Sequence, residues 1–346
     1  MNTEKILVTG AAGFIGYHVA RRLAEQGRPV VGIDNFNAYY DPALKHARLA
    51  ELAIFPAFRF EQLDLADRAS TAALFTANHF THVIHLAAQP GVRHSLVDPY
   101  AYLDANLAGF LNVLEGCRHS GCRHLLYASS SAVYGGNTKT PFRTGDPADH
   151  PLSLYGATKK ANEGMAHAYA HLFGLPTTGL RLFTVYGPWG RPDMAVWMFT
   201  EAIIEGRPIR LFNQGEMRRD FTFIDDVVEA IVRLIDHPPA GDPTRPDQQP
   251  DPSASRAPWR IYNIGNNATV SVTYMVTALE SAIGRTAIRE FQPMQPGDML
   301  ETSADTADLK EATGFHPNTP LEEGLQRFVE WYKGHRNKIP LTAIPR

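Results

Sequence analysis

Cysteine is scarce in this chain, which has two cysteines among 346 residues. Cys117 and Cys122 lie five positions apart, and no metal-ligand pattern surrounds them. We therefore expect two reduced thiols in or near a helix, no metal site, and a reducing compartment such as the cytoplasm.

Long apolar runs and a strong net charge are also missing. No stretch reaches the ~18 apolar residues of a membrane-spanning helix, and the N-terminal MNTEKILVTG lacks the apolar run of a secretion signal. The formal net charge of −3 favours neither nucleic acid nor an anionic membrane as a partner. With 44% hydrophobic and 20% charged residues, the composition is typical of a globular protein with one large domain or two unequal ones.

The first half of the chain alternates short apolar runs with helical patterns. Strands are predicted at residues 5–10, 29–34, 58–67, 82–88 and 124–131, and helices at 14–27 and 106–121. Strands that alternate with helices indicate βαβ units and a parallel sheet. The predicted fold class is therefore α/β, with a Rossmann-type doubly wound sheet that binds ligands beyond the carboxyl ends of its strands.

The second half is less regular. A sixth strand is predicted at 177–187, a helix at 195–206 within an otherwise irregular segment 188–215, a strand at 260–265, and helices at 273–284 and 321–334. Residues 237–258 are rich in Pro, Asp and Ser, which predicts a mobile surface loop that buries no apolar surface. We expect residues 1–180 to form the dinucleotide-binding domain, joined by some later segments. Residues 181–346 would mainly form a smaller C-terminal α/β substrate-binding domain.

The stretch VTGAAGFIG places Gly10, Gly13 and Gly16 between a predicted strand and a predicted helix. Glycine permits a sharp turn and a close approach to a pyrophosphate, and the helix N-terminus offers free N–H groups to the anion. A purely structural glycine turn is the alternative.

Two acids follow predicted strands. Asp34 ends the second strand, where a carboxylate binds the ribose hydroxyls of NAD and would repel the additional phosphate of NADP. No basic residue is evident at this strand end, so NAD is the predicted cofactor. Asp64 could reach the adenine, or it could simply cap a helix or a turn.

Tyr155 and Lys159 lie four residues apart in SLYGATKKANE, so both can point from one helix face toward the same ligand. A nearby ammonium and an oxidised nicotinamide would lower the pKa of the tyrosine and make it a usable base. Ser130, at the end of the fifth strand, could hydrogen-bond the same substrate alcohol. Taken alone, each of these features is also typical of an exposed helix face or a solvated turn.

Together these motifs resemble the extended short-chain dehydrogenase/reductase family, over nearly the whole chain. The resemblance rests on TGAAGFIG, Asp34, HLAAQ, SSSAVYG, YGATK and RDFTFIDD. Within the family, GIDNFNAYYDPALKHARL, HLAAQPGVRHS, RLFTVYGPWGRPDMA and PMQPGD most resemble UDP-glucuronate 4-epimerases.

The resemblance implies a set of site residues. It assigns the catalytic triad to Ser130, Tyr155 and Lys159. It assigns NAD binding to Gly10, Gly13, Phe14, Ile15, Gly16, Asp34, Asn35, Asp64, Leu65, Ala87, Ala88, Gln89, Asn106, Tyr155 and Lys159. It assigns substrate binding to Ser131, Thr184, Arg191, Phe212, Arg219, Gln295 and Asp298, with Phe212 packing on the uracil and Arg219 binding the diphosphate.

Simpler interpretations of three of these residues stay open. Phe212 could be a core residue, Arg219 could form a surface ion pair with Asp220, and Arg191 could be an exposed loop arginine.

Galactose-type epimerases of the family carry an asparagine at the position of Thr184 and an arginine near Gln295. Both differences favour a substrate other than a neutral hexose.

The function that the resemblance implies is NAD-dependent C4 epimerisation of UDP-glucuronate to UDP-galacturonate. The reaction would pass through a transient 4-keto sugar, with the hydride returned to the opposite face. Hydroxyls of Ser131 and Thr184 would restrain the sugar carboxylate. Relatives that decarboxylate or dehydrate carry an acid just after the catalytic Ser or Thr, whereas no acid follows Ser130 in this chain. The alternatives are a UDP-glucose 4-epimerase, a UDP-glucuronate decarboxylase or a non-catalytic NAD-binding protein. A homodimer with helices around Asn106 and Tyr155 at its interface is also expected.

Overall fold

Seven parallel strands form the central sheet, in the order β10-β6-β5-β4-β1-β2-β3. The computed structural model describes residues 4–244, 251–294, 298–335 and 338–339. The strands are β1 (Ile6–Thr9), β2 (Val30–Asp34), β3 (Phe58–Gln62), β4 (His82–His85), β5 (His124–Ser130), β6 (Thr177–Leu182) and β10 (Trp259–Ile264). The strand order reverses between β1 and β4, which is where doubly wound sheets bind their ligands. The predicted fold class is confirmed.

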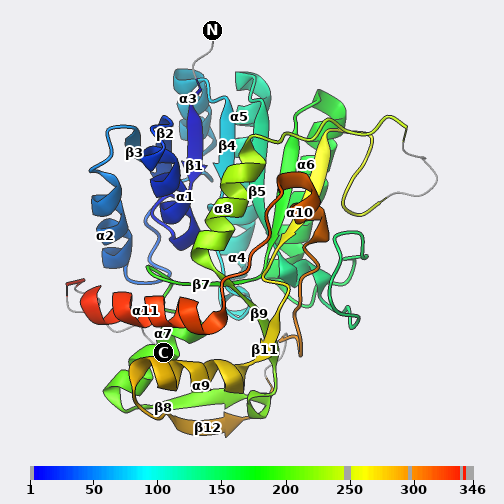
Figure 1. Ribbon diagram of the computed structural model, residues 1–346. Helices are drawn as coiled ribbons and strands as arrows, with labels where there is room; N and C mark the ends of the chain where they lie inside the picture. The colour runs from blue at the N-terminus through cyan, green and yellow to red at the C-terminus, as the bar shows by residue number, and fades with distance from the viewer. Residues whose placement is uncertain (1–3, 245–250, 295–297, 336–337, 340–346) are drawn as a thin grey trace.

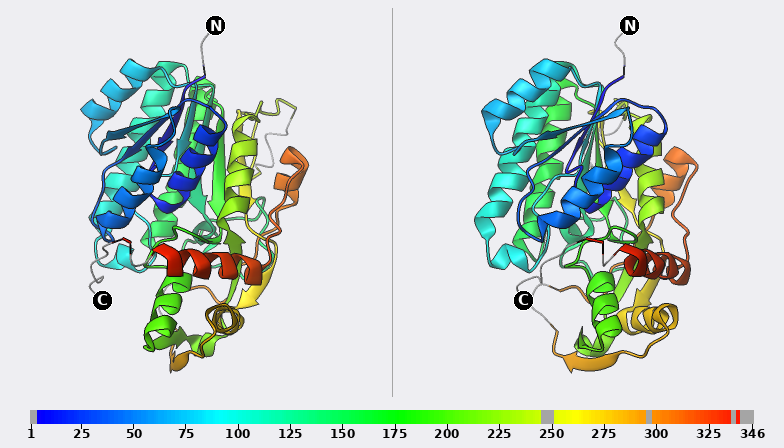
Figure 2. Two further views of the ribbon diagram at one scale, coloured as in Figure 1. Left: turned by 60° about the vertical axis from the view of Figure 1, so that its left-hand side comes forward. Right: turned by 90° about the vertical axis from the view of Figure 1, so that its left-hand side faces the viewer.

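Helices cover both faces of this sheet, so its inner strands are buried on both sides (Figures 1 and 2), whereas the edge strand β3 is mostly exposed. One core packs against α1 (Phe14–Glu25), α2 (Pro42–Leu52) and α8 (Ile224–Ile235). The other core packs against α3 (Arg68–Asn78), α5 (Gly109–Ser120) and α6 (Leu154–Phe173). All four residues of β1 and all seven of β5 are buried, as expected for continuous apolar runs in a parallel sheet.

A smaller group of elements lies beyond the carboxyl ends of the central strands, in the lower part of Figure 1. It contains a three-stranded sheet of β7 (Thr184–Tyr186), β9 (Arg218–Phe223) and β11 (Thr269–Ser271), and a parallel pair of β8 (Pro208–Phe212) and β12 (Ile288–Gln292). Its helices are α7 (Ala195–Glu205), α9 (Val272–Ile283) and α11 (Leu321–His335). These elements therefore face the carboxyl ends of the central strands, and residues of both parts line one cavity.

Short segments complete the chain. They are η1 (His94–Leu96), α4 (Pro99–Tyr102), η2 (Leu103–Ala108), η3 (Ser131–Tyr134), η4 (Asn213–Gly215) and α10 (Ala307–Thr313). Within the part of the chain that the structure describes, no helix is both long and apolar enough to span a bilayer.

Three predicted elements differ from the structure. The strand expected at 58–67 ends at Gln62, where the chain leaves the sheet. The strand expected at 177–187 is two strands, because the chain passes from β6 in the central sheet to β7 in the three-stranded sheet at Phe183. The segment 188–215, expected to be irregular apart from one helix, also contains β8.

The Pro-rich segment is partly packed. Residues 245–250 lie outside the described part of the chain, but Ser253, Ala254 and Ala257 are buried. The amide of Ile261 donates to the carbonyl of Ser253 at 2.8 Å, so this part of the segment runs along the edge strand β10. The prediction that the segment buries no apolar surface is therefore wrong for residues 253–257. Its mobility, and the domain boundary at residue 180, stay predictions.

Candidate active site

The glycine-rich turn lies between β1 and α1, at the point where the strand order reverses. Gly10 has a φ of +69°, and a side chain there would lie 2.9 Å from the backbone of Ala87. A β-carbon on Gly16 would overlap the carbonyl of Gly10. No side chain caps the N-terminus of α1, so its first N–H groups are available to a ligand. The turn therefore fits the pyrophosphate of a dinucleotide, which its backbone could approach closely.

The two strand-end acids lie beside this turn. Asp34, at the end of β2, is buried and accepts hydrogen bonds from the amide of Phe36 at 2.8 Å and from Nζ of Lys45 at 3.2 Å. Asp64 accepts from the amide of Ala66 at 2.9 Å and from Nδ2 of Asn35 at 3.1 Å. Asp64 thus stabilises a turn and also lines the cavity described below, while its contact with the adenine stays a prediction.

Lys45 corrects one expectation, since a basic side chain does lie at the end of β2. It comes from α2, eleven positions after Asp34, and is buried against that carboxylate. Sequence reasoning missed it because a lysine in PALKHARLAEL reads as an exposed helix residue. The ammonium of Lys45 is engaged by Asp34 and by Oδ1 of Asn37 at 3.0 Å, and the carboxylate of Asp34 still lines the cavity.

The loop after β4 is held by hydrogen bonds to Asn106, a residue that does not line the cavity. Oδ1 of Asn106 accepts from the amide of Gln89 at 2.8 Å, and its Nδ2 donates to Oγ1 of Thr158 at 3.1 Å. Neither Asn106 nor Gln89 is among the described residues that line the cavity, whereas Ala87 and Ala88 are. Asn106 and Gln89 therefore support the loop that presents the two alanines.

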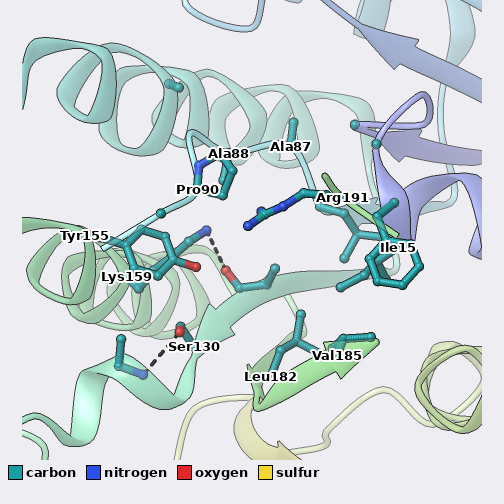
Figure 3. A pocket seen from close by; sticks show the side chains of 18 of the residues that line it. Ile15, Ala87, Ala88, Pro90, Ser130, Tyr155, Lys159, Leu182, Val185 and Arg191 are labelled. Carbon is teal, nitrogen blue, oxygen red and sulfur yellow. Dashed lines mark hydrogen bonds between the residues drawn. The ribbon is translucent and has the colours of Figure 1, made fainter. Parts of the chain in front are cut away.

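Ser130, Tyr155 and Lys159 meet at the carboxyl end of β5 (Figure 3). Ser130 ends β5, and its Oγ accepts from the amide of Ala132 at 3.1 Å. Tyr155 and Lys159 project from the first turns of α6, which begins after the capping residue Ser153. Lys159 is buried, and its Nζ donates to the carbonyl of Ala128 at 2.9 Å. The predicted triad is thus assembled around one space.

The acid–base properties of this group correct another expectation. In the chain alone, burial raises the pKa of Tyr155 above its usual value, although the hydroxyl of Ser130 and the charge of Arg191 act in the opposite direction. Burial also lowers the pKa of Lys159 to about 8. The predicted lowering of the tyrosine pKa is therefore absent without a cofactor, because desolvation outweighs the neighbouring groups. A positively charged nicotinamide would supply the missing stabilisation of the phenolate.

Most of the predicted substrate residues reach the same cavity from the smaller part of the molecule, whereas Ser131 directly follows β5. Ser131, Thr184, Arg191, Arg219 and Asp298 all line the cavity. Arg191 is half-buried and pairs with Asp193 at 2.9 Å, so it is not an exposed loop arginine. Arg219 donates to the carbonyl of Arg218 at 2.9 Å and does not pair with Asp220.

Asp220 excludes the surface ion pair that was one interpretation of Arg219. It is fully buried and accepts from the amides of Asn266 at 2.7 Å and Ala304 at 3.1 Å. Burial raises the pKa of Asp220 to about 6 despite these hydrogen bonds. The carboxylate therefore ties β9 to two neighbouring segments and leaves Arg219 available to a ligand.

Among the predicted substrate residues that the structure describes, Phe212 alone is not on the cavity wall. Phe212 is half-buried, and the guanidinium of Arg93 lies 4.6 Å from its ring centroid, so it is neither core nor cavity lining in this conformation. Arg93 also pairs with Asp298 at 2.9 Å, and Asp298 lines the cavity. Phe212 therefore lies near the rim of the cavity. Gln295 lies outside the described residues.

One cavity of about 450 Å³ contains the glycine turn, the strand-end acids, the triad and the substrate residues. It extends from β1 and β2 to Arg219 and Asp298 on the smaller part. Figure 3 shows Arg191 and Tyr155 directed into it from opposite sides. Among the described residues, no group of three or more His, Cys, Asp or Glu side chains could hold a metal ion.

A Rossmann-type sheet with a dinucleotide-binding turn and a Ser–Tyr–Lys set in one cavity defines a class, the nicotinamide-dependent enzymes of short-chain dehydrogenase type. Residues 6–265 match the model of the NAD-dependent epimerase/dehydratase family. The chain belongs to this family.

Individual relatives narrow the comparison. A probable UDP-glucuronate 4-epimerase of Rhizobium meliloti is 48% identical over 98% of this chain and 100% of its own length. The crystal structure of UDP-glucuronic acid 4-epimerase from Bacillus cereus, in complex with UDP-glucuronic acid and NAD, superimposes with a TM-score of 0.84. It is 32% identical, over 95% of this chain and 99% of that one. A UDP-glucose 4-epimerase from Thermotoga maritima, with UDP-glucose, has a TM-score of 0.81 and 29% identity over 96% of this chain and 99% of its own.

Proposed function

We propose that this protein interconverts UDP-glucuronate and UDP-galacturonate by NAD-dependent epimerisation at C4. The observation that carries the proposal is the position of Tyr155, which lies with Ser130 and Lys159 in the same cavity as the glycine turn. The similarity to UDP-glucuronate 4-epimerases over nearly the whole chain supports the choice of sugar.

Tyr155 would take the proton of the sugar 4-hydroxyl and later return it. The hydroxyl of Ser130 would hydrogen-bond the same oxygen and keep it directed at the phenol. The ammonium of Lys159 would stabilise the phenolate by its charge. Bound NAD⁺ would accept the hydride from C4 and give it back to the opposite face, so that no net oxidation occurs.

Binding energy from the nucleotide would hold the substrate while its sugar turns. Arg219 could bind the diphosphate bidentately, because its guanidinium faces the cavity without a carboxylate partner among the described residues. Phe212 would have to exchange its contact with Arg93 for a contact with the uracil.

The sugar carboxylate sets a second requirement, since a 4-keto uronic acid loses CO₂ readily. Ser131 and Thr184 present hydroxyls to the cavity and could hold the carboxylate without protonating it. The carboxylates that line the cavity among the described residues are Asp34, Asp64 and Asp298. The first two lie at the predicted adenosine end, and Asp298 is paired with Arg93. The absence of an acid next to Ser130 in the sequence favours epimerisation over dehydration or decarboxylation.

The direct test is incubation of the purified protein with UDP-glucuronate, without added reductant or NAD. Chromatography should show UDP-galacturonate, with no UDP-pentose and no CO₂. Release of CO₂ would instead identify a decarboxylase. Conversion of UDP-glucose with no conversion of UDP-glucuronate would identify the alternative epimerase.

We also propose a homodimer formed through the segments around Asn106 and Tyr155. Large apolar side chains are exposed there, at Leu96, Val97, Tyr100, Leu103 and Leu111. Light scattering should give the mass of a dimer, and Leu111→Glu should give a monomer. Ile54→Glu, at an equally apolar exposed position after α2, is the matched control and should leave the dimer intact.

We also propose that the protein is located in the cytoplasm. Cys117 and Cys122 are both buried and free, which suits a reducing compartment.

A further inference from the structure

Arg48 of α2 carries a positive charge into the interior and meets no carboxylate there. Its side chain is 0% exposed, and it forms no ion pair with any carboxylate that the structure describes. Its guanidinium donates to the carbonyls of Ala12 at 2.9 Å, Trp189 at 2.7 Å and Gly190 at 3.1 Å, and to the hydroxyl of Tyr40 at 2.7 Å. An apolar side chain would avoid the cost of burying this charge, so stability alone does not account for the arginine.

These four hydrogen bonds join segments that are distant in the sequence. Ala12 belongs to the glycine turn, and Tyr40 precedes α2. Trp189 and Gly190 belong to the loop of residues 187–191, which leads from β7 to α7 and ends at Arg191. The planar guanidinium therefore fixes the loop directly to the turn that would hold the cofactor pyrophosphate.

The 187–191 loop adopts a conformation that needs such support. Trp189 has a φ of 60°, which is costly for a bulky residue, and such strain persists only where the surroundings impose it. Its ring packs on Tyr17 of α1, with a centroid distance of 5.5 Å. Nε2 of His18 lies 2.9 Å from the carbonyl of Pro188. Three consecutive carbonyls of the loop are thus engaged by side chains of α1 and α2.

Arg191 is the next residue after this anchored stretch. Its guanidinium enters the cavity and faces the triad, as Figure 3 shows. Asp193 holds the far side of the guanidinium, through bonds of 3.0 Å and 2.9 Å. The position of the Arg191 backbone, by contrast, depends on the two carbonyls that Arg48 binds.

We propose that Arg48 is a positioning residue that fixes Arg191 relative to the glycine turn, and so relates the sugar end of the site to the cofactor end. The proposal rests on the proposed function, in which Arg191 contacts the substrate. Lysine cannot replace the arginine, because one ammonium cannot reach two segments in the planar geometry of the guanidinium.

A double-mutant cycle tests the proposal, with Arg48→Lys introduced alone and together with Arg191→Ala. Alone, Arg48→Lys should raise the KM for UDP-glucuronate about tenfold, as expected for groups that are energetically coupled. In the Arg191→Ala background the same change should alter KM less than twofold, because the residue that Arg48 positions is already gone. An equal effect in both backgrounds would overturn the proposal.

Val113→Ala is the control for general destabilisation. Val113 belongs to α5 and is buried in the other core, to which neither the loop nor the glycine turn contributes a residue. It should lower the melting temperature and leave KM unchanged in both backgrounds. If Arg48→Lys does not fold, Arg48→Gln repeats the cycle, and failure of both to fold would assign the arginine a structural role and overturn the proposal.

Failure of the proposed function would be visible separately. A wild-type protein that does not convert UDP-glucuronate contradicts the function, and the cycle is then run on the UDP-sugar that calorimetry shows to bind. If the wild-type protein converts UDP-glucuronate but Arg48→Lys changes KM equally with and without Arg191→Ala, only the role of Arg48 is contradicted.

Discussion

At the scale of single residues, the proposed mechanism depends on the phenol of Tyr155. Tyr155 lies in a cavity where burial raises its pKa, so it needs every neighbouring positive charge to act as a base near neutral pH. Replacing it with phenylalanine removes the proton carrier and keeps the ring that packs near Tyr102, at a centroid distance of 6.2 Å.

We expect Tyr155→Phe to reduce kcat at least ~100-fold, which is the lower range of general acid–base catalysis. The turn and Asp34 are unchanged, so the variant should still bind NAD. Turnover is measured by chromatography, and bound NAD by its absorbance after denaturation. Retention of more than a tenth of the wild-type kcat would remove Tyr155 from the mechanism.

Lys159 provides a second prediction, on pH dependence. In the proposed mechanism its ammonium favours the phenolate form of Tyr155, so Lys159→Met should raise the pKa of the tyrosine further. The rise of kcat with pH should therefore move to higher pH, and activity at neutral pH should fall. A pH–rate profile measures both effects.

Lys139→Met is the control, because Lys139 is exposed and lies on the loop after η3. It should leave the profile of the wild type unchanged. A Lys159→Met profile that falls in height without moving along the pH axis would show that the lysine acts by structure alone.

At the scale of elements, a buried ion pair joins α6 to the central sheet. Glu163 of α6 accepts from Arg181 of β6 at 2.8 Å and from Oγ of Ser129 in β5 at 2.7 Å. Burial alone would raise the pKa of Glu163, but the guanidinium of Arg181 holds it below its usual value. The pair thus fixes the helix that carries Tyr155 to the strand that carries Ser130.

Removing one partner should leave the other charge buried and uncompensated. We expect Arg181→Met to lower the free energy of unfolding by about 3–5 kcal/mol, measured by urea denaturation. Arg260→Met, which removes a half-exposed pair with Asp308, should cost less than about 1 kcal/mol. Equal losses in the two variants would contradict the importance of burial.

The central elements could be predicted because their signals are local. Strands β1 and β2 are short, largely apolar runs, and the turn, the strand-end Asp34 and the spacing of Tyr155 and Lys159 stand in the sequence itself. The break at Phe183 could not be predicted, since RLFTVYG is apolar on both sides of it. The strand β8 was not predicted because its partner β12 lies about 80 residues away, and the residues PIRLF contain no local signal for this pairing.

The site residues divide in the same way. Among the described residues, the predicted site residues line the cavity, with the exceptions of Phe212 and of the supporting residues Gln89 and Asn106. Lys45 and Arg48 could not be recognised, because two basic residues three apart on a helix normally face solvent. Here that face of α2 is turned inward with Leu44 and Leu52, a placement that only tertiary packing decides.

At the scale of the whole molecule, buried titrating groups determine how stability responds to acid. Burial lowers the pKa of His85 to about 3, and of His18 and His124 to about 4. In the unfolded chain each histidine titrates near ~6.5. Between these values only the unfolded state binds the proton, so each histidine contributes stability above pH ~6.5 that is lost as the pH falls. Asp220 acts in the opposite direction, because its folded pKa is raised to about 6.

Among these four groups, three histidines against one aspartate leave a net uptake of about two protons on unfolding between pH 6 and pH 4.5. We therefore expect these four groups to lower the free energy of unfolding by roughly 2–3 kcal/mol per pH unit in this range, at about 1.4 kcal/mol for each proton. Urea denaturation at several pH values measures the slope. His124→Gln, at a fully buried position, should reduce it by about one proton, whereas His119→Gln, at a side chain that is 68% exposed, should not change it. Equal slopes in all three proteins would mean that His124 is protonated in the folded state, and that its bonds to Thr178 and to the carbonyl of Ile235 hold an imidazolium.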